Sequence, residues 1–210
     1  MQHSSSTEVE PSAVTQQSMM IIRPAEDRDF QAIADIYNEA IAHGGITMDD
    51  CPHSANDIQT IVEKMTDREL LLVGEIAAEP DRNEHQQHSS HHVIGWGIVK
   101  RYSDRPGYHV CCETSIYLTF SQSGKGYGRS LQTALMNEVR KFDYHHIVAK
   151  IVASNQNSIR FHQQFGFELV GIQERIGFMR DQWYDVAIMQ CLYCNCVVPH
   201  STITTNDCSH

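Results

Sequence analysis

Ser121-Gln-Ser-Gly-Lys-Gly-Tyr-Gly-Arg-Ser-Leu131 is a glycine-rich stretch between a strand-like run and a long helical pattern. Its three glycines stand at alternate positions: Gly124, Gly126 and Gly128. Glycine lets the backbone approach a bound group closely, and the first N–H groups of a helix have no partner inside the helix. The stretch therefore predicts a phosphate site at the start of the helix, with Lys125 and Arg129 adding positive charge, or a turn that only redirects the chain.

The segments on either side of this stretch alternate between strand and helix patterns. We expect strands over 19–25, 69–78, 93–100, 111–120, 146–153, 167–178 and 184–193, and helices over 30–41, 55–67, 125–142 and 155–165. The polar segment 79–92 joins two of the strands as the long tip of a hairpin. This order predicts an α/β fold in which the glycine-rich turn lies at the centre of a mixed β-sheet flanked by helices.

The length and composition of the chain indicate one globular domain. The sequence has 210 residues and 41% hydrophobic content, which is enough for a single sizeable core. Residues 1–18 are rich in Ser, Thr, Gln and Glu without hydrophobic periodicity, so we expect a disordered leader there. The domain is expected over 19–193, followed by a flexible tail with cysteines and histidines over 194–210.

The charge of the chain argues against nucleic acid and anionic membranes as partners. The formal net charge is -10 at pH 7, whereas both of these partners need a positive surface. No apolar run approaches the length that crosses a bilayer, and the N-terminus has no apolar core of a signal peptide. These features predict a cytoplasmic protein. An anionic cofactor remains compatible with the charge, because backbone N–H groups bind phosphate locally.

Seven cysteines in a chain without an export signal are expected to be reduced thiols rather than a disulfide framework. The C-terminus gathers a weak set of metal ligands: Cys191, Cys194, Cys196, His200, Cys208 and His210. The hairpin tip carries a second set: His85, His88, His91 and His92. The first set lacks the second spaced pair of a zinc site, and an exposed loop accounts for the second set. We therefore predict no metal requirement.

Two motifs in the expected order resemble the GNAT superfamily of acetyltransferases. Gly124-x-Gly126-x-Gly128 resembles the superfamily's pyrophosphate loop for acetyl-CoA, and the segment that starts at Asn155 resembles its next helix: Asn155-x-x-Ser158-x-x-Phe161-His162-x-x-x-Gly166-Phe167. Further matches over about residues 20–192 resemble the phosphinothricin and methionine sulfone N-acetyltransferase family: Arg105-Pro-Gly-Tyr108, Glu113-Thr-Ser-Ile-Tyr-Leu118 and Gly177-Phe-x-x-x-x-Trp183-x-Asp185. The P-loop and the dinucleotide fingerprint do not fit the glycine spacing and position.

The resemblance implies the GNAT fold and acetyl-CoA as co-substrate. The residues implied to bind it are Ile116, Tyr117, Leu118, Gly124, Lys125, Gly126, Tyr127, Gly128, Arg129, Asn155 and Ser158. The backbone of 116–118 would pair with the pantetheine arm as if the arm were a further strand. Asn155 could also cap the N-terminus of its helix, and this role is compatible with a contact to the cofactor.

The resemblance also implies the residues that act on the acceptor amine. Glu113 would take a proton from the amine, acting through water; alternatively, it binds the substrate ammonium or pairs with Arg105. His162 would protonate the departing CoA thiolate, or it would only pack beside its aromatic neighbours. Four residues are expected to form the substrate pocket: Thr47, Arg105, Tyr108 and Trp183.

The expected reaction is transfer of an acetyl group from acetyl-CoA to the primary amine of a small amino-acid-like molecule. Two rivals remain: a GNAT enzyme for another metabolite or a peptide N-terminus, and a non-catalytic acyl-CoA or metal-binding protein. The sequence departs from the family pattern at three positions. Ser123 stands where the superfamily usually has arginine or glutamine, Ser103 replaces an arginine that is often found there, and Met48 replaces a common aromatic residue. Gln122 is a neighbour that could replace the first of these. The resemblance also implies a homodimer.

Overall fold

The computed structural model describes residues 19–77 and 91–193. The leader expected over 1–18, the tail over 194–210 and most of the histidine-rich hairpin tip lie outside these residues. The elements follow in chain order as β1 (Ile21–Pro24), η1 (Asp27–Asp29), α1 (Phe30–His43), α2 (Ala55–Glu63), β2 (Leu70–Ala77), β3 (His91–Arg101), η2 (Pro106–Tyr108), β4 (Cys111–Leu118), η3 (Phe120–Gln122), α3 (Tyr127–Lys141), β5 (His146–Val152), α4 (Gln156–Gln163), β6 (Glu168–Met179) and β7 (Gln182–Leu192). Every strand and helix expected from the sequence is present.

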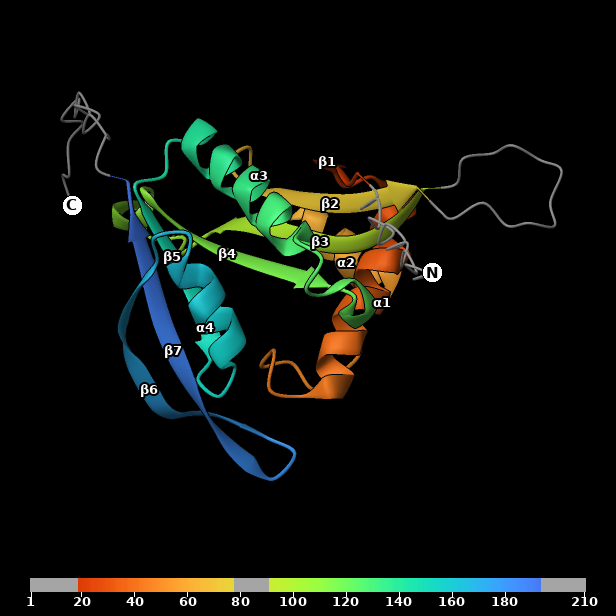
Figure 1. The fold of residues 1–210 in the computed structure, drawn as a ribbon. Coiled ribbons are helices and arrows are strands. Elements are labelled where there is room, and N and C mark those ends of the chain that lie inside the picture. Colours follow the sequence, from red (N-terminus) through yellow and green to blue (C-terminus); the bar gives the residue numbers. More distant parts are fainter. Residues whose placement is uncertain (1–18, 78–90, 194–210) are drawn as a thin grey trace, which may run out of the picture.

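A single mixed sheet organises the described residues, with strand order β1-β2-β3-β4-β5-β7-β6. All neighbouring strands are antiparallel except β4 and β5, which are parallel. Figure 1 shows α3 and α4 in front of the sheet and α1 and α2 behind it. The α/β sandwich predicted from the alternating patterns is therefore confirmed, with the glycine-rich turn following the central strand β4.

The alternation of apolar side chains along the strands fills a core on each face of the sheet. Leu71 and Val73 of β2 pack in one buried cluster with α1 and α2, whereas Leu72 between them packs in another cluster with α3 and α4. Successive side chains of a strand point to opposite faces, so one strand supplies both cores. The sheet is thus fixed between two helical layers.

Local backbone conformation and hydrogen bonds set the boundaries of α1 and α2. The last turn of α1 is closed by Gly44, which has φ of 76°. The first turn of α2 is closed by a reciprocal pair of hydrogen bonds between Ser54 and Asp57. This helix ends at Glu63, four residues before the expected end at 67, because Thr66 donates backbone and side-chain hydrogen bonds to Glu69 and starts a turn there.

A gap opens in the middle of the sheet. The parallel pairing of β4 and β5 begins at Cys111 and His146 and extends no further than Glu113 and Val148. Beyond that point β4 continues to Leu118 while pairing with β3 alone, and β5 continues while pairing with β7. The two strands therefore diverge, and main-chain groups of β4 face the gap without a strand partner on that side.

The described part of the chain contains four cysteines, and none of them forms a disulfide with another described residue: Cys51, Cys111, Cys112 and Cys191. Burial raises the pKa of Cys111 to about 11, so this thiol stays protonated at neutral pH. Cys191 lies in the core, and the other candidate metal ligands of the C-terminal set lie outside the described residues. No helix among the described residues is both long and apolar enough to cross a bilayer.

The two-sided core makes a direct prediction about stability. Leu135 of α3 is fully buried, so Leu135→Ala should lower the free energy of unfolding by about 2–5 kcal/mol, through lost apolar contact and the cavity left behind. The same truncation at the half-exposed Leu192 should cost no more than about 0.5 kcal/mol. Urea denaturation of both variants measures the difference, and equal losses would contradict the assignment of the core.

Candidate active site

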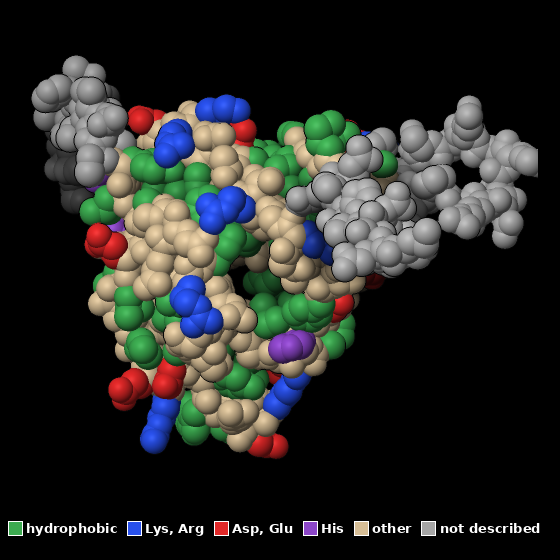
Figure 2. All heavy atoms as spheres, in the orientation of Figure 1, with side chains coloured by type: hydrophobic (Ala, Val, Ile, Leu, Met, Phe, Trp, Pro, Cys, Tyr) green, Lys and Arg blue, Asp and Glu red, His purple; other side chains and the backbone are tan. Residues whose placement is uncertain are grey.

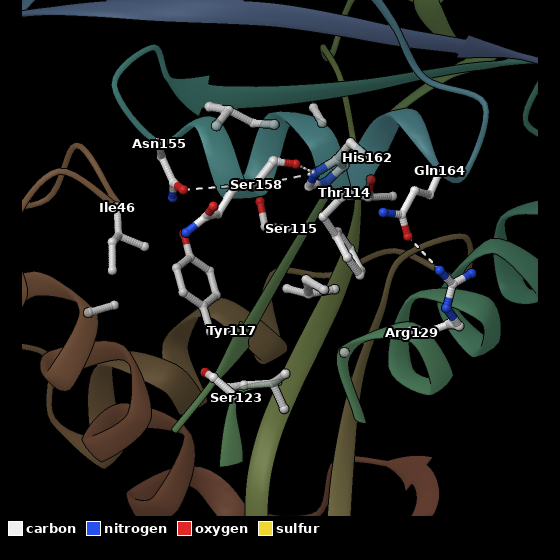
Figure 3. A pocket seen from close by; sticks show the side chains of 18 of the residues that line it. Ile46, Thr114, Ser115, Tyr117, Ser123, Arg129, Asn155, Ser158, His162 and Gln164 are labelled. Carbon is white, nitrogen blue, oxygen red and sulfur yellow. Dashed lines mark hydrogen bonds between the residues drawn. The ribbon is translucent and has the colours of Figure 1, made fainter. Parts of the chain in front are cut away.

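Two cavities meet at the gap between β4 and β5. The first, of about 460 Å³, lies among β4, β5, the start of α3 and α4. The second, of about 640 Å³, lies on the α1 and α2 side of the sheet. The residues that line both are Ile46, Ser115, Tyr117 and Lys150. Figure 2 shows the surface hollowed near the middle of the molecule, and Figure 3 shows the first cavity from close by. A ligand that passes through the gap would reach from one cavity into the other.

The glycine-rich turn forms one end of the first cavity. Gly124 and Gly126 have φ of 77° and 82°, a region that other residues rarely adopt, and Gly126 caps α3 without any side chain. A Cβ on Gly128 would lie 3.1 Å from Leu118 Cδ1, so glycine at this position allows α3 to start close to the end of β4. The helix therefore presents its first N–H groups and the nearby Arg129 to the cavity, as a phosphate site requires.

Two residues of the same stretch are oriented differently from the sequence expectation. Tyr127 packs its side chain with Ile76 and Ile94 in a small buried cluster, so only its backbone is available to a ligand. Lys125 donates a hydrogen bond to Gln122 at 3.0 Å and does not line the cavity. Gln122 thus orders the turn through Lys125, whereas Ser123 itself lines the cavity.

Beyond Glu113, the edge of β4 that faces the gap has no strand partner among the described residues. Thr114 lines the first cavity and is buried, yet its Oγ1 has no hydrogen-bond partner. A buried hydroxyl without a partner is costly unless a ligand or water satisfies it. The residues expected to pair with the arm, Ile116, Tyr117 and Leu118, lie next to Thr114 along the same open strand edge.

Asn155 and Ser158 lie at the start of α4 and line the first cavity (Figure 3). The Asn155 side chain accepts a hydrogen bond from the Ser158 backbone N–H at 3.1 Å, so the capping role considered from the sequence is confirmed. The cap fixes the position of both side chains relative to the gap. Contact of either residue with a cofactor remains a prediction.

His162 belongs to α4 and is buried, although its ring lines the first cavity. Its Nδ1 lies 2.8 Å from the Ser158 carbonyl oxygen, which only accepts, so Nδ1 carries the proton. The ring packs edge-on against Phe161 and Phe167. Burial lowers the pKa of His162, so the ring is neutral at neutral pH with its lone pair on Nε2. This arrangement favours the packing alternative over a proton donor to the thiolate.

Glu113 lies where the two strands separate, and its side chain is 12% exposed in the second cavity. Its Oε2 is 2.7 Å from Lys150 Nζ, and its Oε1 is 3.5 Å from Lys100 Nζ. Arg105 was an alternative partner of Glu113 in the sequence analysis, but the structure places Lys100 and Lys150 beside the Glu113 carboxylate instead. A carboxylate held beside a cavity at the end of the gap is positioned to receive a proton from an amine.

The second cavity contains only one of the four expected substrate residues. Thr47 lines it, whereas Arg105, Tyr108 and Trp183 do not. Tyr108 is 45% exposed and packs against Tyr102, and Trp183 is 58% exposed and packs against Phe178. In the described residues these side chains lie on exposed loops and a hairpin, outside the cavity.

Sequence reasoning missed several side chains that do line the second cavity. Tyr37 of α1 hydrogen-bonds Thr47 at 2.7 Å and also donates to Asp49. Its ring packs edge-on against Tyr117, which lies at the junction of the cavities. In the sequence Tyr37 follows the apolar helical spacing, so nothing in the pattern distinguished it from a core residue. Lys100 is placed by its register opposite Glu113.

The comparisons with known proteins agree with this geometry. Residues 22–188 match the family model described as an acetyltransferase (GNAT) domain. The chain belongs to the GNAT acetyltransferase family. Within it, the phosphinothricin N-acetyltransferase of Streptomyces coelicolor is 26% identical over 167 residues, covering 79% of this chain and 92% of that protein. An L-methionine sulfoximine/L-methionine sulfone acetyltransferase of Salmonella typhimurium is 29% identical over 171 residues, covering 81% of this chain and 93% of that protein.

A solved structure extends the likeness to three dimensions. The yncA protein of Salmonella typhimurium, solved with its cofactor acetyl-CoA, has a TM-score of 0.74 and 27% identity, covering 87% of this chain and 98% of that chain. The resemblance identified from the glycine spacing and the α4 motif is thus confirmed at the level of family and fold. Among the described residues, no group of three or more His, Cys, Asp or Glu side chains is arranged to hold a metal ion.

The protonation of His162 makes a prediction about pH. Because the pKa of His162 is lowered by burial, the unfolded chain takes up a proton that the folded chain resists. The stability from this residue is therefore present above the ordinary histidine pKa of about 6.5 and is lost as pH falls through the lower folded value. Urea unfolding between pH 8 and pH 5 should show a smaller loss of stability in His162→Gln than in the parent. Identical pH dependence would contradict the assignment of a buried neutral ring.

Proposed function

We propose that the protein transfers the acetyl group of acetyl-CoA to the primary amine of a small amino-acid-like molecule of the phosphinothricin or methionine sulfone and sulfoximine type. The observation that carries the proposal is the meeting of the two cavities at the gap where the strands separate, with Glu113 lining the second cavity beside that gap. The names of the relatives support the acceptor class. Direct attack of an amine on a thioester needs no metal ion.

The first cavity is proposed to bind acetyl-CoA. The glycine-rich turn and Arg129 would hold the pyrophosphate through backbone N–H groups and charge. The arm would enter the gap beside Ile116–Leu118, with Asn155 and Ser158 on its other side. The fixed N–H groups at the gap would then lie near the thioester oxygen and stabilise negative charge that develops during attack.

The second cavity is proposed to bind the acceptor. An ammonium must lose a proton before it attacks, and Glu113 would receive that proton directly or through water. Much of the acceleration would come from holding the amine and the thioester together at the junction. A cavity of about 640 Å³ suits a small molecule better than a peptide, and Met48 helps to close it by packing against Gly177.

Release of thiol from acetyl-CoA over a panel of amines tests the proposal. The panel includes methionine sulfone, methionine sulfoximine and phosphinothricin, and Glu113→Gln should reduce the rate by about 10²- to 10⁴-fold, as expected for loss of a general base. Glu138→Gln is the matched control, because Glu138 also pairs with a lysine, Lys141, but lines neither cavity. No turnover with any panel amine, although acetyl-CoA binds, would refute the proposed acceptor class.

We also infer that two copies of the chain associate through the β6–β7 hairpin, which extends away from the other elements in Figure 1. Among the described strands, β6 lies at the end of the sheet order and pairs with β7 alone. Its exposed apolar side chains include Leu169, Val170, Ile172, Ile176 and Phe178. An edge strand and an apolar surface of this size would be covered by the same surface of a second copy, since a two-fold contact is self-complementary. A cytoplasmic location remains a prediction from the sequence.

Light scattering during gel filtration tests the association. Val170 and Ile172 are each more than half exposed, so replacing both with Asp should leave the fold intact and shift the molar mass from two chains to one. Arg160→Asp on α4, which adds a negative charge outside the hairpin, serves as the control and should keep the mass of the parent. A parent protein of one chain's mass, or unchanged association of the double variant, would refute the inference.

A further inference from the structure

Lys150 occupies an unusual position in the sheet. It belongs to β5, whose neighbouring residues from Ile147 to Val152 are otherwise buried, yet its side chain is 46% exposed. The exposure exists because β4 has separated from β5 at this level, so the side chain lies at the gap. Among the described residues that line both cavities, Lys150 alone carries an amine.

The register of the strands places Lys150 beside the proposed base. Glu113 pairs with Val148 across the parallel strands, and Lys150 lies two residues further along, on the same face of the sheet. As a result its Nζ is 2.7 Å from Glu113 Oε2. A nucleophile and a base within hydrogen-bond reach of each other are the arrangement that covalent chemistry requires.

We propose that Lys150 is a site of self-acetylation, so that the enzyme acetylates its own side chain when no acceptor fills the second cavity. The inference rests on the proposed function, because the acetyl group must come from acetyl-CoA in the first cavity. Lys150 would take the place of the acceptor amine. Its long, flexible side chain lets the amine move between the carboxylate and the junction of the two cavities.

The reaction uses the same steps as transfer to a free amine. Glu113 takes one proton from the Lys150 ammonium and later passes it to solvent. The neutral Nζ attacks the thioester carbonyl carbon, a C–N bond forms and the C–S bond breaks. The second proton lost from Nζ goes to the sulfur, so the products are Nε-acetyl-lysine, CoA thiol and one released proton.

Lys100 provides a matched comparison within the same molecule. It faces the same carboxylate at 3.5 Å, and its side chain is 47% exposed, almost the same as Lys150. It lines the second cavity but not the first. Unguided chemical acetylation depends on access and basicity and has no requirement for the first cavity, whereas transfer from a bound thioester requires a position at the junction.

The experiment is a time course of site-specific acetylation by peptide mass spectrometry on the full chain with acetyl-CoA and no acceptor. Acetylation of Lys150 should exceed that of Lys100 and of the surface residue Lys141 by about tenfold or more, the advantage of a positioned reactant. Excess CoA thiol should suppress acetylation at Lys150 and leave Lys141 unchanged. Acetyl phosphate lacks the CoA arm, so the ratio of acetylation at Lys150 to acetylation at Lys100 that it gives measures chemical acetylation without a bound cofactor.

Two variants complete the test. Lys150→Arg should remove the main acetyl adduct from the intact mass, and Glu113→Gln should reduce acetylation at Lys150 toward the level at Lys141, with melting temperatures confirming that both fold. The inference is overturned if the ratio of acetylation at Lys150 to acetylation at Lys100 is the same with acetyl-CoA as with acetyl phosphate. It is also overturned if excess CoA thiol does not reduce acetylation at Lys150. Thiol release with the amine panel is measured alongside. Turnover without Lys150 acetylation would overturn this inference alone and leave the proposed function standing.

Discussion

The separation of β4 from β5 is the constraint on which the site depends. Parallel pairing ends at Glu113 and Val148, and each strand then pairs only with its outer neighbour. A continuous sheet would close the passage between its two faces and satisfy the main-chain groups of β4 internally. The divergence instead joins two cavities that lie on opposite helical layers, and it leaves polar backbone available to a ligand in an otherwise buried region.

The surrounding packing holds this opening in place. On one face, the absence of a side chain at Gly128 brings the start of α3 against Leu118, at the end of β4. On the other face, Tyr117 packs against Tyr37 and Trp96, which fixes the strand against α1. The helix N-terminus and the aromatic cluster therefore act on the same strand from opposite sides. A site built on such packed elements is more precise than one built on loops alone.

The sequence predicted the elements that depend on local pattern. It did not predict the positions of site side chains that depend on strand register or burial. Glycine spacing located the turn before α3, and alternation located the strands. Lys150 looked like an ordinary polar interruption of a buried strand, because only the pairing of β4 with β5 brings it to Glu113. Conversely, Arg105 and Trp183 lie in recognisable motifs, but no local pattern states which way an exposed loop or hairpin directs its side chains.

The charges of the second cavity bear on the kind of acceptor that it can hold. Its lining contains two cations, Lys100 and Lys150, and two anions, Asp49 and Glu113. A simple amine would add a positive charge and compete with Lys150 for the carboxylate. A zwitterionic amino acid adds one charge of each sign, so its carboxylate can pair with a lysine as its ammonium reaches Glu113, and the desolvation of each charge is offset by a partner. The ion pair that holds Glu113 in the free protein therefore favours an acceptor that carries its own negative charge.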